Sequence, residues 1–535
     1  MAENYLNILA DTIRNNWDAP ALTDFYLTED GSAQDTSRGN HYTYGEMYAE
    51  ICRVANLLTS LGLQKGDHIA ICGANSAHWV IAYLAIAKMQ GVSVTVMHTL
   101  MPDEIARLVA FSDAKALFTD EDLWAEISPR LGRGDGDRLS SVISLSDWSI
   151  LRGEKIQISN LQSSISNFDC GFPQSNPDDL AMICFTSGTS GSAKGVMLSI
   201  NSISNNVAYK LNIFAHYEGT NVLAILPFAH IYGLVIELLL PLCAGAITNI
   251  IISNTISIKN IVGSCKLLKP KIIFVVPRVV EYLISENFDL TRIFSGLDFL
   301  SVGGAELKKD TEHYLQQNNI GIAVGYGSTE CGTRITLATP QEYRSGSVGK
   351  IVNGLELKIS PAGEILVKGE NVMLGYYKDP EATAAKIDKD GWLHTGDKGH
   401  LDEDGYLYVE GRLEQDIIVL PNGENIRPDH IESLINALPE VSESIVLARD
   451  GHLVAIVVPA TPSSVSSASS VTSASSASSE SSETRASSPS SSLRRKILRT
   501  VNPSLPLFSQ LYDVEITDQP LARTEKQTLK RYLYS

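Results

Sequence analysis

Apolar residues recur at two distinct spacings in the first part of the chain. Within 43–62 they return every three or four positions, which predicts an amphipathic helix, and Thr43 and Glu46 have the spacing of a capping box at its start. Short continuous apolar runs predict buried strands, and longer apolar stretches predict further helices. These segments are 68–72 (strand), 77–90 (helix), 92–97 (strand) and 102–111 (helix). The alternation of strands and helices predicts parallel β-α-β units.

The same alternation resumes later in the chain and then gives way to two other patterns. Further strands are predicted at 180–184, 221–226, 271–276 and 298–302. Between 326 and 411 the sequence becomes Gly-rich, and Asp404-Gly405 between apolar runs indicates a hairpin, so a β-rich subdomain is expected. A compact tail follows, with strands expected at 417–420, 444–448, 453–458 and 512–516 and helices at 428–437 and 493–501.

Composition limits the classes of function. With 535 residues the chain is long enough for more than one domain, and 43 basic against 61 acidic residues give a net charge of −18, which argues against nucleic-acid binding. Seven scattered cysteines without a C-x-x-C pair indicate thiols in a reducing compartment. No secretory signal and no membrane-spanning stretch is found, so a cytoplasmic protein is expected, which leaves peripheral membrane contact open.

One Gly-rich loop has the properties of a polyphosphate site. Residues 185–197 read F-T-S-G-T-S-G-S-A-K-G-V-M, in which glycines let backbone N–H groups approach anionic oxygens while hydroxyl groups and Lys194 add donors and charge. The spacing does not match a P-loop, and a flexible Gly/Ser turn is the alternative. The candidate phosphate-binding residues are Thr186, Ser187, Gly188, Thr189, Ser190, Gly191 and Lys194, of which Thr186 and Lys194 are also catalytic candidates.

This loop resembles the T-S-G-T-T-G-x-P-K-G sequence of the adenylate-forming superfamily, which includes acyl-CoA synthetases, luciferases and peptide-synthetase adenylation domains. Ser190 and Ala193 depart from that sequence, and alanine in place of proline loosens the loop. The resemblance implies an α/β fold: a large AMP-binding domain (1–411) of parallel α/β sheets with a β-rich subdomain, and a small, mobile α+β C-terminal domain (412–535). A Ser-rich insertion at 463–492 interrupts the second domain and is expected to be disordered.

His230 is the candidate for the acid-binding side of the site. A lone histidine among apolar residues is commonly a satisfied core residue, but the run L-P-F-A-H-I-Y-G at 226–233 resembles a family element that borders the carboxylate pocket. Gly303 and Gly325 are assigned to the same pocket by resemblance. Adenylation domains for α-amino acids usually carry an aspartate in the stretch around the histidine, and Phe228, Ala229 and Ile231 offer none. An apolar carboxylic acid is therefore favoured.

Two further motifs are assigned to the nucleotide and its metal. The sequence G-G-A-E-L at 303–307 ends a predicted strand, opens a predicted helix and resembles the family segment that lies along adenine; its candidates are Gly304, Ala305 and Glu306. The sequence Y-G-S-T-E at 326–330 resembles Y-G-x-T-E. By that resemblance Tyr326 and Gly327 border adenine, Thr329 contacts the α-phosphate and Glu330 helps to hold Mg²⁺, which accepts one carboxylate together with phosphate oxygens.

The resemblance continues through the end of the first domain into the second. The sequence W-L-H-T-G-D at 392–397 resembles W-x-x-T-G-D, which assigns Asp397 to the ribose hydroxyls, with Arg412 as a second ribose contact. Glu414 falls at the expected hinge, although 413–422 is about one residue longer than the family pattern. Gly423 resembles the glycine of a turn that faces the coenzyme A tunnel.

Lys526 is the candidate for the catalytic cation. The end of the chain keeps the spacing of P-x-x-x-x-G-K, with Glu525 in place of glycine, and Lys530 is a competing assignment. Attack of a carboxylate on the α-phosphorus builds negative charge, which a preorganised cation stabilises. A solvated basic tail is the structural alternative.

Together these motifs indicate an AMP-forming acid–thiol ligase with ATP, Mg²⁺ and coenzyme A. The phrases at 367–383 and 417–426 look most like medium- to long-chain fatty acid ligases. An acyl carrier protein as acceptor and an aryl acid as substrate are the enzymatic alternatives. A non-catalytic nucleotide-binding relative is the alternative of another class, and a luciferase-like oxygenase is the least favoured.

Overall fold

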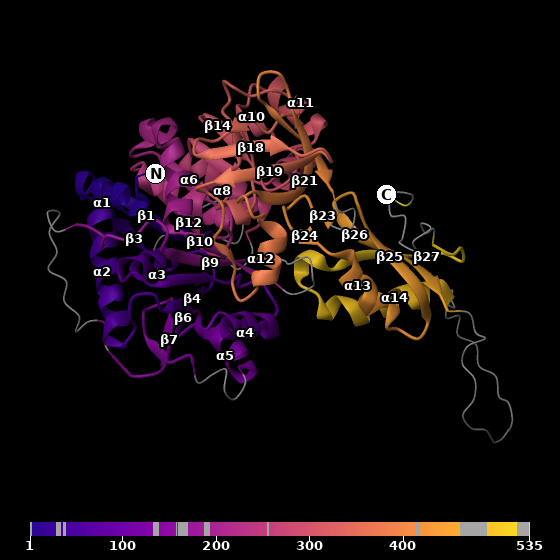
Figure 1. The fold of residues 1–535 in the computed structure, drawn as a ribbon, viewed down its shortest axis with the longest axis horizontal. Coiled ribbons are helices and arrows are strands. Elements are labelled where there is room, and N and C mark those ends of the chain that lie inside the picture. The colour runs from indigo at the N-terminus through magenta and orange to yellow at the C-terminus, as the bar shows by residue number, and fades with distance from the viewer. Residues whose placement is uncertain are drawn as a thin grey trace. The chain divides into compact units, whose positions relative to one another are not determined.

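The computed structural model describes residues 3–27, 34–35, 39–131, 138–156, 158, 170–186, 193–253, 256–413, 418–460, 489–521 and 534. The chain divides into two compact units. One consists of Met1–Leu413 and Pro421–Gly423, and the other of Glu414–Leu420 and Glu424–Ser535. In Figure 1 the colour runs from indigo to orange along the larger unit and from orange to yellow along the smaller one.

The first sheet of the larger unit carries the strands on both sides of the Gly-rich loop. Its described strands are β4 (His68–Cys72), β5 (Val92–Thr95), β6 (Ala116–Thr119), β7 (Ser141–Ser144), β8 (Ile150–Arg152), β9 (Leu180–Thr186), β10 (Lys194–Ser199) and β20 (Gly375–Tyr376). Their order is β20-β10-β9-β5-β4-β6-β7-β8. The central strands β9, β5, β4, β6 and β7 are parallel, so the predicted β-α-β arrangement is confirmed.

The second sheet gathers the motif-bearing loops at one edge. Its described strands are β1 (Pro20–Leu27), β2 (Gln34–Asp35), β3 (His41–Thr43), β11 (Asn221–Ala224), β12 (Ile247–Ile251), β13 (Ile272–Val275), β14 (Phe299–Val302), β15 (Ile322–Tyr326), β16 (Thr336–Ala338) and β17 (Lys350–Ile351). Strands β12, β11, β13, β14 and β15 are parallel neighbours. Because their carboxyl ends share an edge, the segments after β11, β14 and β15 emerge there together.

Helices cover these sheets, and one strongly apolar helix is buried on all sides along most of its length. In α3 (Ala77–Lys88) every residue from Ala77 to Ile86 is buried, as expected for a helix without a polar face. It packs against α2 (Tyr44–Ser60), whose predicted capping box of Thr43 and Glu46 is formed. The other described α-helices of this unit are α1 (Tyr5–Asn15), α4 (Pro102–Phe111), α5 (Glu121–Ile127), α6 (Ile200–Phe214), α7 (Leu240–Cys243), α8 (Ile258–Leu268), α9 (Pro277–Ser285), α10 (Leu290–Ile293), α11 (Lys309–Gln317) and α12 (Pro380–Lys386).

The predicted β-rich part forms a separate antiparallel sheet. Its strands are β18 (Leu355–Ile359), β19 (Glu364–Gly369), β21 (Leu393–Leu401) and β22 (Leu407–Arg412), in that order. The predicted hairpin at Asp404-Gly405 joins β21 to β22, and Gly405 has a φ of 81°, a conformation that favours glycine.

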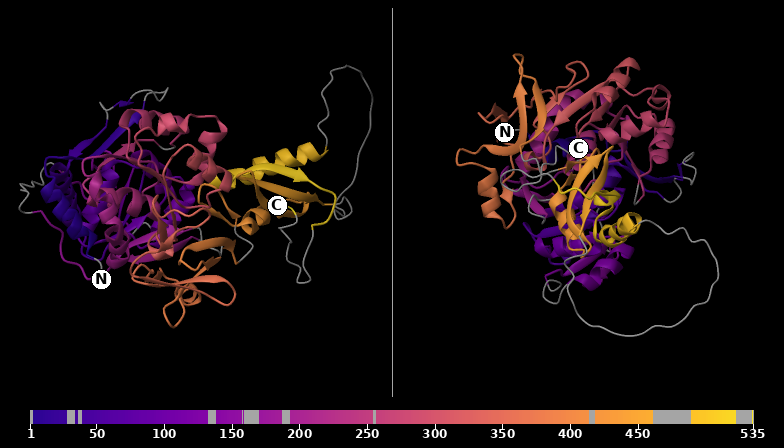
Figure 2. Two further views of the ribbon diagram at one scale, coloured as in Figure 1. Left: turned by 90° about the horizontal axis from the view of Figure 1, so that it is seen from above. Right: turned by 90° about the vertical axis from the view of Figure 1, so that its right-hand side faces the viewer.

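The smaller unit has its own core. Its described elements are β23 (Ile418–Val419), β24 (Asn425–Ile426), α13 (Pro428–Asn436), β25 (Val441–Arg449), β26 (His452–Pro459), α14 (Pro489–Val501) and β27 (Leu511–Ile516). The sheet β25-β26-β27 packs against α13 and α14, and Ile435, Val446 and Ile497 lie in the core between them (Figure 2). Most of the Ser-rich insertion lies outside the described residues.

Candidate active site

Tyr326 and Asp397, the residues predicted to border adenine and ribose, contact each other directly. Tyr326 ends β15 and its hydroxyl donates to Asp397 Oδ2 at 2.6 Å, across 71 positions of sequence. Burial raises the pKa of Tyr326, and the negative charge of Asp397 raises it further. The phenol therefore keeps its proton and acts as a donor.

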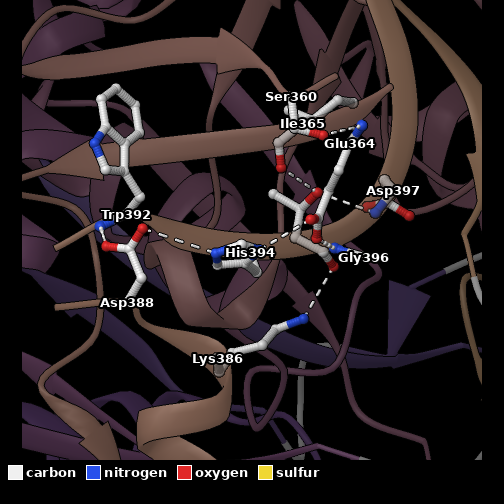
Figure 3. A network of polar contacts seen from close by, with 10 residues as sticks. Ser360, Glu364, Ile365, Lys386, Asp388, Trp392, His394, Gly396 and Asp397 are labelled. Carbon is white, nitrogen blue, oxygen red and sulfur yellow. Dashed lines mark hydrogen bonds and ion pairs between the residues drawn. The ribbon is translucent and has the colours of Figure 1, made fainter. Parts of the chain in front are cut away.

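A network of polar contacts holds the backbone that carries Asp397 (Figure 3). The N–H of Asp397 donates to Thr395 Oγ1 at 3.0 Å, and the N–H of Gly396 donates to Glu364 Oε1 at 3.0 Å. Lys386 Nζ donates to the carbonyl of Thr395 at 3.0 Å. These bonds hold the T-G-D sequence in place: the threonine and glutamate satisfy the backbone of β21 where its pairing with β19 is irregular, and Gly396 there has a φ of 78°.

Glu330 is connected to the Gly-rich loop through a residue that the sequence analysis did not single out. Glu330 lies in the short turn η6 (Thr329–Cys331), and its Oε1 accepts a hydrogen bond of 2.8 Å from the hydroxyl of Tyr376. The ring centroid of Tyr376 lies 4.9 Å from Lys194 Nζ. Burial, and then the charge of Glu330, raise the pKa of Tyr376. The position of Tyr376 opposite Val196 in the sheet, and not a sequence motif, places it here.

Thr186 and Lys194 close the two ends of the Gly-rich loop. They are paired in register as the last residue of β9 and the first residue of β10. The other loop candidates, Ser187, Gly188, Thr189, Ser190 and Gly191, lie outside the described residues.

His230 has an imidazole whose tautomer is defined by the backbone. Its Nδ1 accepts a hydrogen bond of 3.2 Å from the N–H of Tyr232, so the ring is neutral with its proton on Nε2. The ring is accessible to solvent, yet the surrounding protein lowers its pKa by desolvation. A neutral imidazole with an accessible N–H can donate a hydrogen bond to an acid.

Buried Glu237 fixes the segment that leads to His230. It lies in the π-helix η5 (Tyr232–Leu239), is fully buried, and accepts hydrogen bonds from the N–H groups of Ile225 and Leu226 at 2.9 and 2.8 Å. Burial raises the pKa of Glu237. A single acidic residue in an otherwise apolar run was the sequence feature that could have revealed it.

Close packing explains the glycines assigned to the acid pocket and nucleotide. A Cβ on Gly303 would lie 3.0 Å from Tyr232 Cζ, and one on Gly325 would lie 3.2 Å from the carbonyl oxygen of Thr336. A Cβ on Gly327 would lie 1.4 Å from the carbonyl oxygen of Thr333, which excludes any side chain there without rearrangement.

The segment after Gly303 differs from the prediction. Gly304 has a φ of 84°, and the helix expected to open there begins only at Lys309, so Ala305 and Glu306 belong to an extended turn. Glu306 is exposed.

The remaining candidates are only partly placed. Arg412 is paired in register with Asp397 across β21 and β22, which puts the two ribose candidates on neighbouring strands. Gly423 has a φ of 85° in the turn between β23 and β24. Glu414 and Lys526 lie outside the described residues.

The donor set fits a nucleotide with magnesium. No cluster of three or more His, Cys, Asp or Glu side chains with metal-binding geometry occurs among the described residues. Glu330 supplies one carboxylate, which suits a magnesium ion that takes its other ligands from phosphate oxygens and water.

Residues 9–377 match the AMP-binding enzyme family, which is more than half of the chain. The chain belongs to this family. The matched region contains the predicted site residues from Thr186 to Glu330, whereas Asp397, Gly423 and Lys526 lie beyond it.

Known proteins are similar to this chain in sequence or in fold. It is 29% identical over 445 residues to 4-coumarate–CoA ligase 4 of Arabidopsis thaliana, covering 77% of this chain and 76% of that protein. The amide bond synthetase McbA of Marinactinospora thermotolerans has a TM-score of 0.76 at 23% identity, with 99% of both chains covered. ATP-bound MatB of Rhodopseudomonas palustris has a TM-score of 0.66 at 22% identity, with 100% of this chain and 98% of that chain covered.

The predicted superfamily and α/β fold are thus confirmed. The AMP-binding enzyme is an adenylate-forming, acid–thiol ligase, a class whose members use ATP, Mg²⁺ and coenzyme A. The preference for a fatty acid is not confirmed, because the relative above is named for 4-coumarate.

Two further predictions concern the whole chain. All seven cysteines are buried and free, as expected. No helix among the described residues has the length and apolar character needed to cross a bilayer.

Proposed function

We propose that this enzyme couples a carboxylic acid to coenzyme A in two steps. In the first, a carboxylate oxygen bonds to the α-phosphorus of ATP, and the bond to the bridging oxygen breaks, which releases pyrophosphate. In the second, the thiol of coenzyme A loses its proton and its sulfur bonds to the acyl carbon, and AMP leaves with the bonding electrons. The observation that carries the proposal is a group of contacts at and after the end of β15. Tyr326 is hydrogen-bonded to Asp397, and Glu330 is hydrogen-bonded to Tyr376, whose ring lies next to Lys194.

Each residue is proposed to act on a defined part of the substrates. Tyr326 and Asp397 orient the nucleoside, Lys194 and Thr186 hold phosphate oxygens at the ends of the Gly-rich loop, and His230 donates from Nε2 to the acid. Glu330 would hold Mg²⁺, which supplies positive charge to the phosphates. Lys526 is proposed to stabilise the charge of the first transition state.

The roles of several other candidate residues are proposed from the family resemblance. Gly304, Ala305, Glu306 and Gly327 are proposed to border the adenine, and Gly325 the acid. Arg412, Glu414 and Gly423 are proposed as ribose contact, hinge and coenzyme A tunnel.

The class of the acid substrate is proposed from two observations that favour different acids. The sequence phrases favour a medium- or long-chain fatty acid, whereas the 4-coumarate–CoA ligases among the relatives support an aryl acid. An acyl carrier protein is the alternative acceptor.

Pyrophosphate release tests the proposal. We would measure it with Mg-ATP and acetate, octanoate, palmitate, oleate, benzoate and 4-coumarate, with and without coenzyme A. Release that follows one acid and produces a thioester supports the ligase and identifies its class. ATP binding without pyrophosphate release for any acid would contradict the proposed ligase function. It would support a non-catalytic nucleotide-binding protein, an alternative suggested by Glu525 in place of glycine.

A further inference from the structure

Arg334 is a buried cation without a partner in the described part of the chain. It lies just before β16 and is 7% exposed. Its Nη1 is buried and makes no hydrogen bond there, and no carboxylate among those residues forms an ion pair with it. Buried charges in proteins are normally paired, because removing an ion from water is costly.

The backbone of Arg334 is held in place. Its N–H donates to Asn206 Oδ1 at 3.1 Å, and its carbonyl accepts from Asn371 Nδ2 at 3.3 Å. On the opposite side, its Cα lies 3.0 Å from where a Cβ on Gly327 would be. The side chain therefore starts from a fixed point inside the fold.

Arg334 follows the Y-G-S-T-E segment closely along the chain, and its guanidinium interacts electrostatically with a residue of the acid-binding side of the proposed active site. The groups that interact with it electrostatically are the phenols of Tyr232 and Tyr209. Tyr232 follows His230 by two positions, donates to the carbonyl of Ser301 at 3.2 Å, and packs its ring against Gly303. Burial lowers the pKa of Arg334 to about 10, so the group is still charged at neutral pH.

We propose that Arg334 binds a second carboxylate, at the far end of an acid substrate whose first carboxylate is activated. This inference rests on the proposed ligase function and narrows its substrate to dicarboxylic acids with an apolar body. A guanidinium presents two parallel N–H groups that match a carboxylate in bidentate geometry, and the phenol of Tyr232, which interacts with it electrostatically, is a further polar group.

The chemistry of the first step favours the second carboxylate over the reacting one. A bidentate ion pair on the reacting carboxylate would stabilise the ground state and withdraw charge from the attacking oxygen, which slows the step. Arg334 also lies outside the Y-G-S-T-E segment, whose residues are assigned to the α-phosphate and metal. A carboxylate at the far end of the substrate would pair with the buried charge of Arg334 and leave the reacting carboxylate free to attack.

Matched pairs of acids test the inference. The pairs are octanoate and octanedioate, benzoate and benzene-1,4-dicarboxylate, and 3-phenylpropanoate and 3-(4-carboxyphenyl)propanoate, each assayed by pyrophosphate release and thioester formation. We expect kcat/KM for at least one diacid to exceed that for its monoacid by roughly 10- to 100-fold, since a charged hydrogen-bonded pair is of that size. Equal values within every pair would overturn the inference.

Variants then assign the preference to the arginine. Arg334→Met should remove the diacid preference while kcat/KM for the monoacid stays largely unchanged, and Arg334→Lys should keep part of the preference because it keeps the charge. Arg344→Met is the matched control: that arginine is exposed and pairs with Asp402 and Asp404 instead. If Arg334→Met slowed both acids of a pair equally, Arg334 would be binding the reacting carboxylate or serving the fold alone.

A binding measurement separates this inference from the ligase function. Thermal unfolding is followed with each acid and α,β-methylene-ATP, which cannot release pyrophosphate. If a diacid stabilised the wild type but not Arg334→Met, while no acid supported pyrophosphate release from ATP, the diacid site would stand and the proposed ligase function would be contradicted. Turnover of monoacids only, with no stabilisation by any diacid, would retain the ligase and overturn the diacid site. Without ligand, Arg334→Met should unfold no earlier than the wild type, because it removes an unpaired buried charge.

Discussion

His230, Glu237 and Arg334 show how the surrounding protein changes the chemistry of single residues. His230 is neutral because its Nδ1 accepts a backbone N–H and desolvation lowers its pKa. Glu237 has two backbone donors and no cation among the described residues, and its pKa is raised. Arg334 remains charged in the interior. Fully solvated glutamates and arginines on the surface have little effect on neighbouring groups.

The histidine predicts a pH dependence of stability. The pKa of an unfolded histidine is about 6.5, and that of folded His230 is lower, so below about pH 6.5 the unfolded chain takes up a proton that the native protein resists. This contribution makes the free energy of unfolding fall as the pH decreases from 7 to 5. His230→Phe should reduce that fall in urea unfolding experiments. Identical slopes for both proteins between pH 5 and 7, with any offset already present at pH 8, would contradict the prediction.

Lys526 predicts a separation of the two steps. If it stabilises only the charge built in adenylate formation, Lys526→Ala should lower pyrophosphate release by about 10²- to 10³-fold and still convert supplied acyl-adenylate to thioester. Lys530→Ala, the competing position, should leave the first step nearly unchanged. An equal loss of both steps in Lys526→Ala would refute this division, and the reverse result for the two lysines would transfer the role to Lys530.

At the scale of elements, local patterns predicted extents well where the chain is regular. The strand at 68–72 and the helix at 102–111 are confirmed at both ends, and the capping box at Thr43 starts its helix as expected. The helix expected after Gly304 begins later because the intervening residues are extended up to Lys308. Such a turn is fixed by its packing partners, which periodicity does not reveal.

The loop between β15 and β16 leaves no space for a side chain at Gly327, which gives a prediction for a substitution there. Gly327→Ala would place a Cβ 1.4 Å from the carbonyl oxygen of Thr333, so the loop that carries Glu330 must shift. We expect a loss of about 1 to 3 kcal/mol in the free energy of unfolding, together with weaker ATP binding by calorimetry. Gly171→Ala is the control, since a Cβ there meets no atom within 4 Å, and should change stability by less than about 0.5 kcal/mol. Normal stability and ATP binding in Gly327→Ala would contradict the loop geometry.

At the scale of the whole molecule, the candidate site residues are distributed over two units with separate cores. The nucleotide candidates Tyr326 and Asp397 lie in the larger unit, whereas Lys526 belongs to the chain of the smaller one. The smaller core forms from residues on both sides of the Ser-rich insertion, because β26 precedes it, α14 begins within its last residues at Pro489, and β27 follows.

That topology predicts tolerance to a shorter insertion. Deleting 470–483 halves the stretch from 461 to 488, and halving a flexible loop changes its closure free energy by only about 0.6 kcal/mol. We expect the thermal midpoint and pyrophosphate release to stay near the wild-type values. A large loss of either would show that the serine tract serves the fold or the reaction.

The sequence by itself determined the superfamily and the alternation of strands and helices, and it predicts the motif residues for the nucleotide, because these depend on local spacing and on a few side chains of defined chemistry. Tertiary structure alone brought Asp397 to Tyr326 and Tyr376 to Glu330, and it left the cation of Arg334 in the interior. Sheet order and burial depend on contacts between distant segments, which no local pattern encodes. The roles of all candidate site residues, Lys526, Arg412, Glu414 and Gly423 among them, stay predictions.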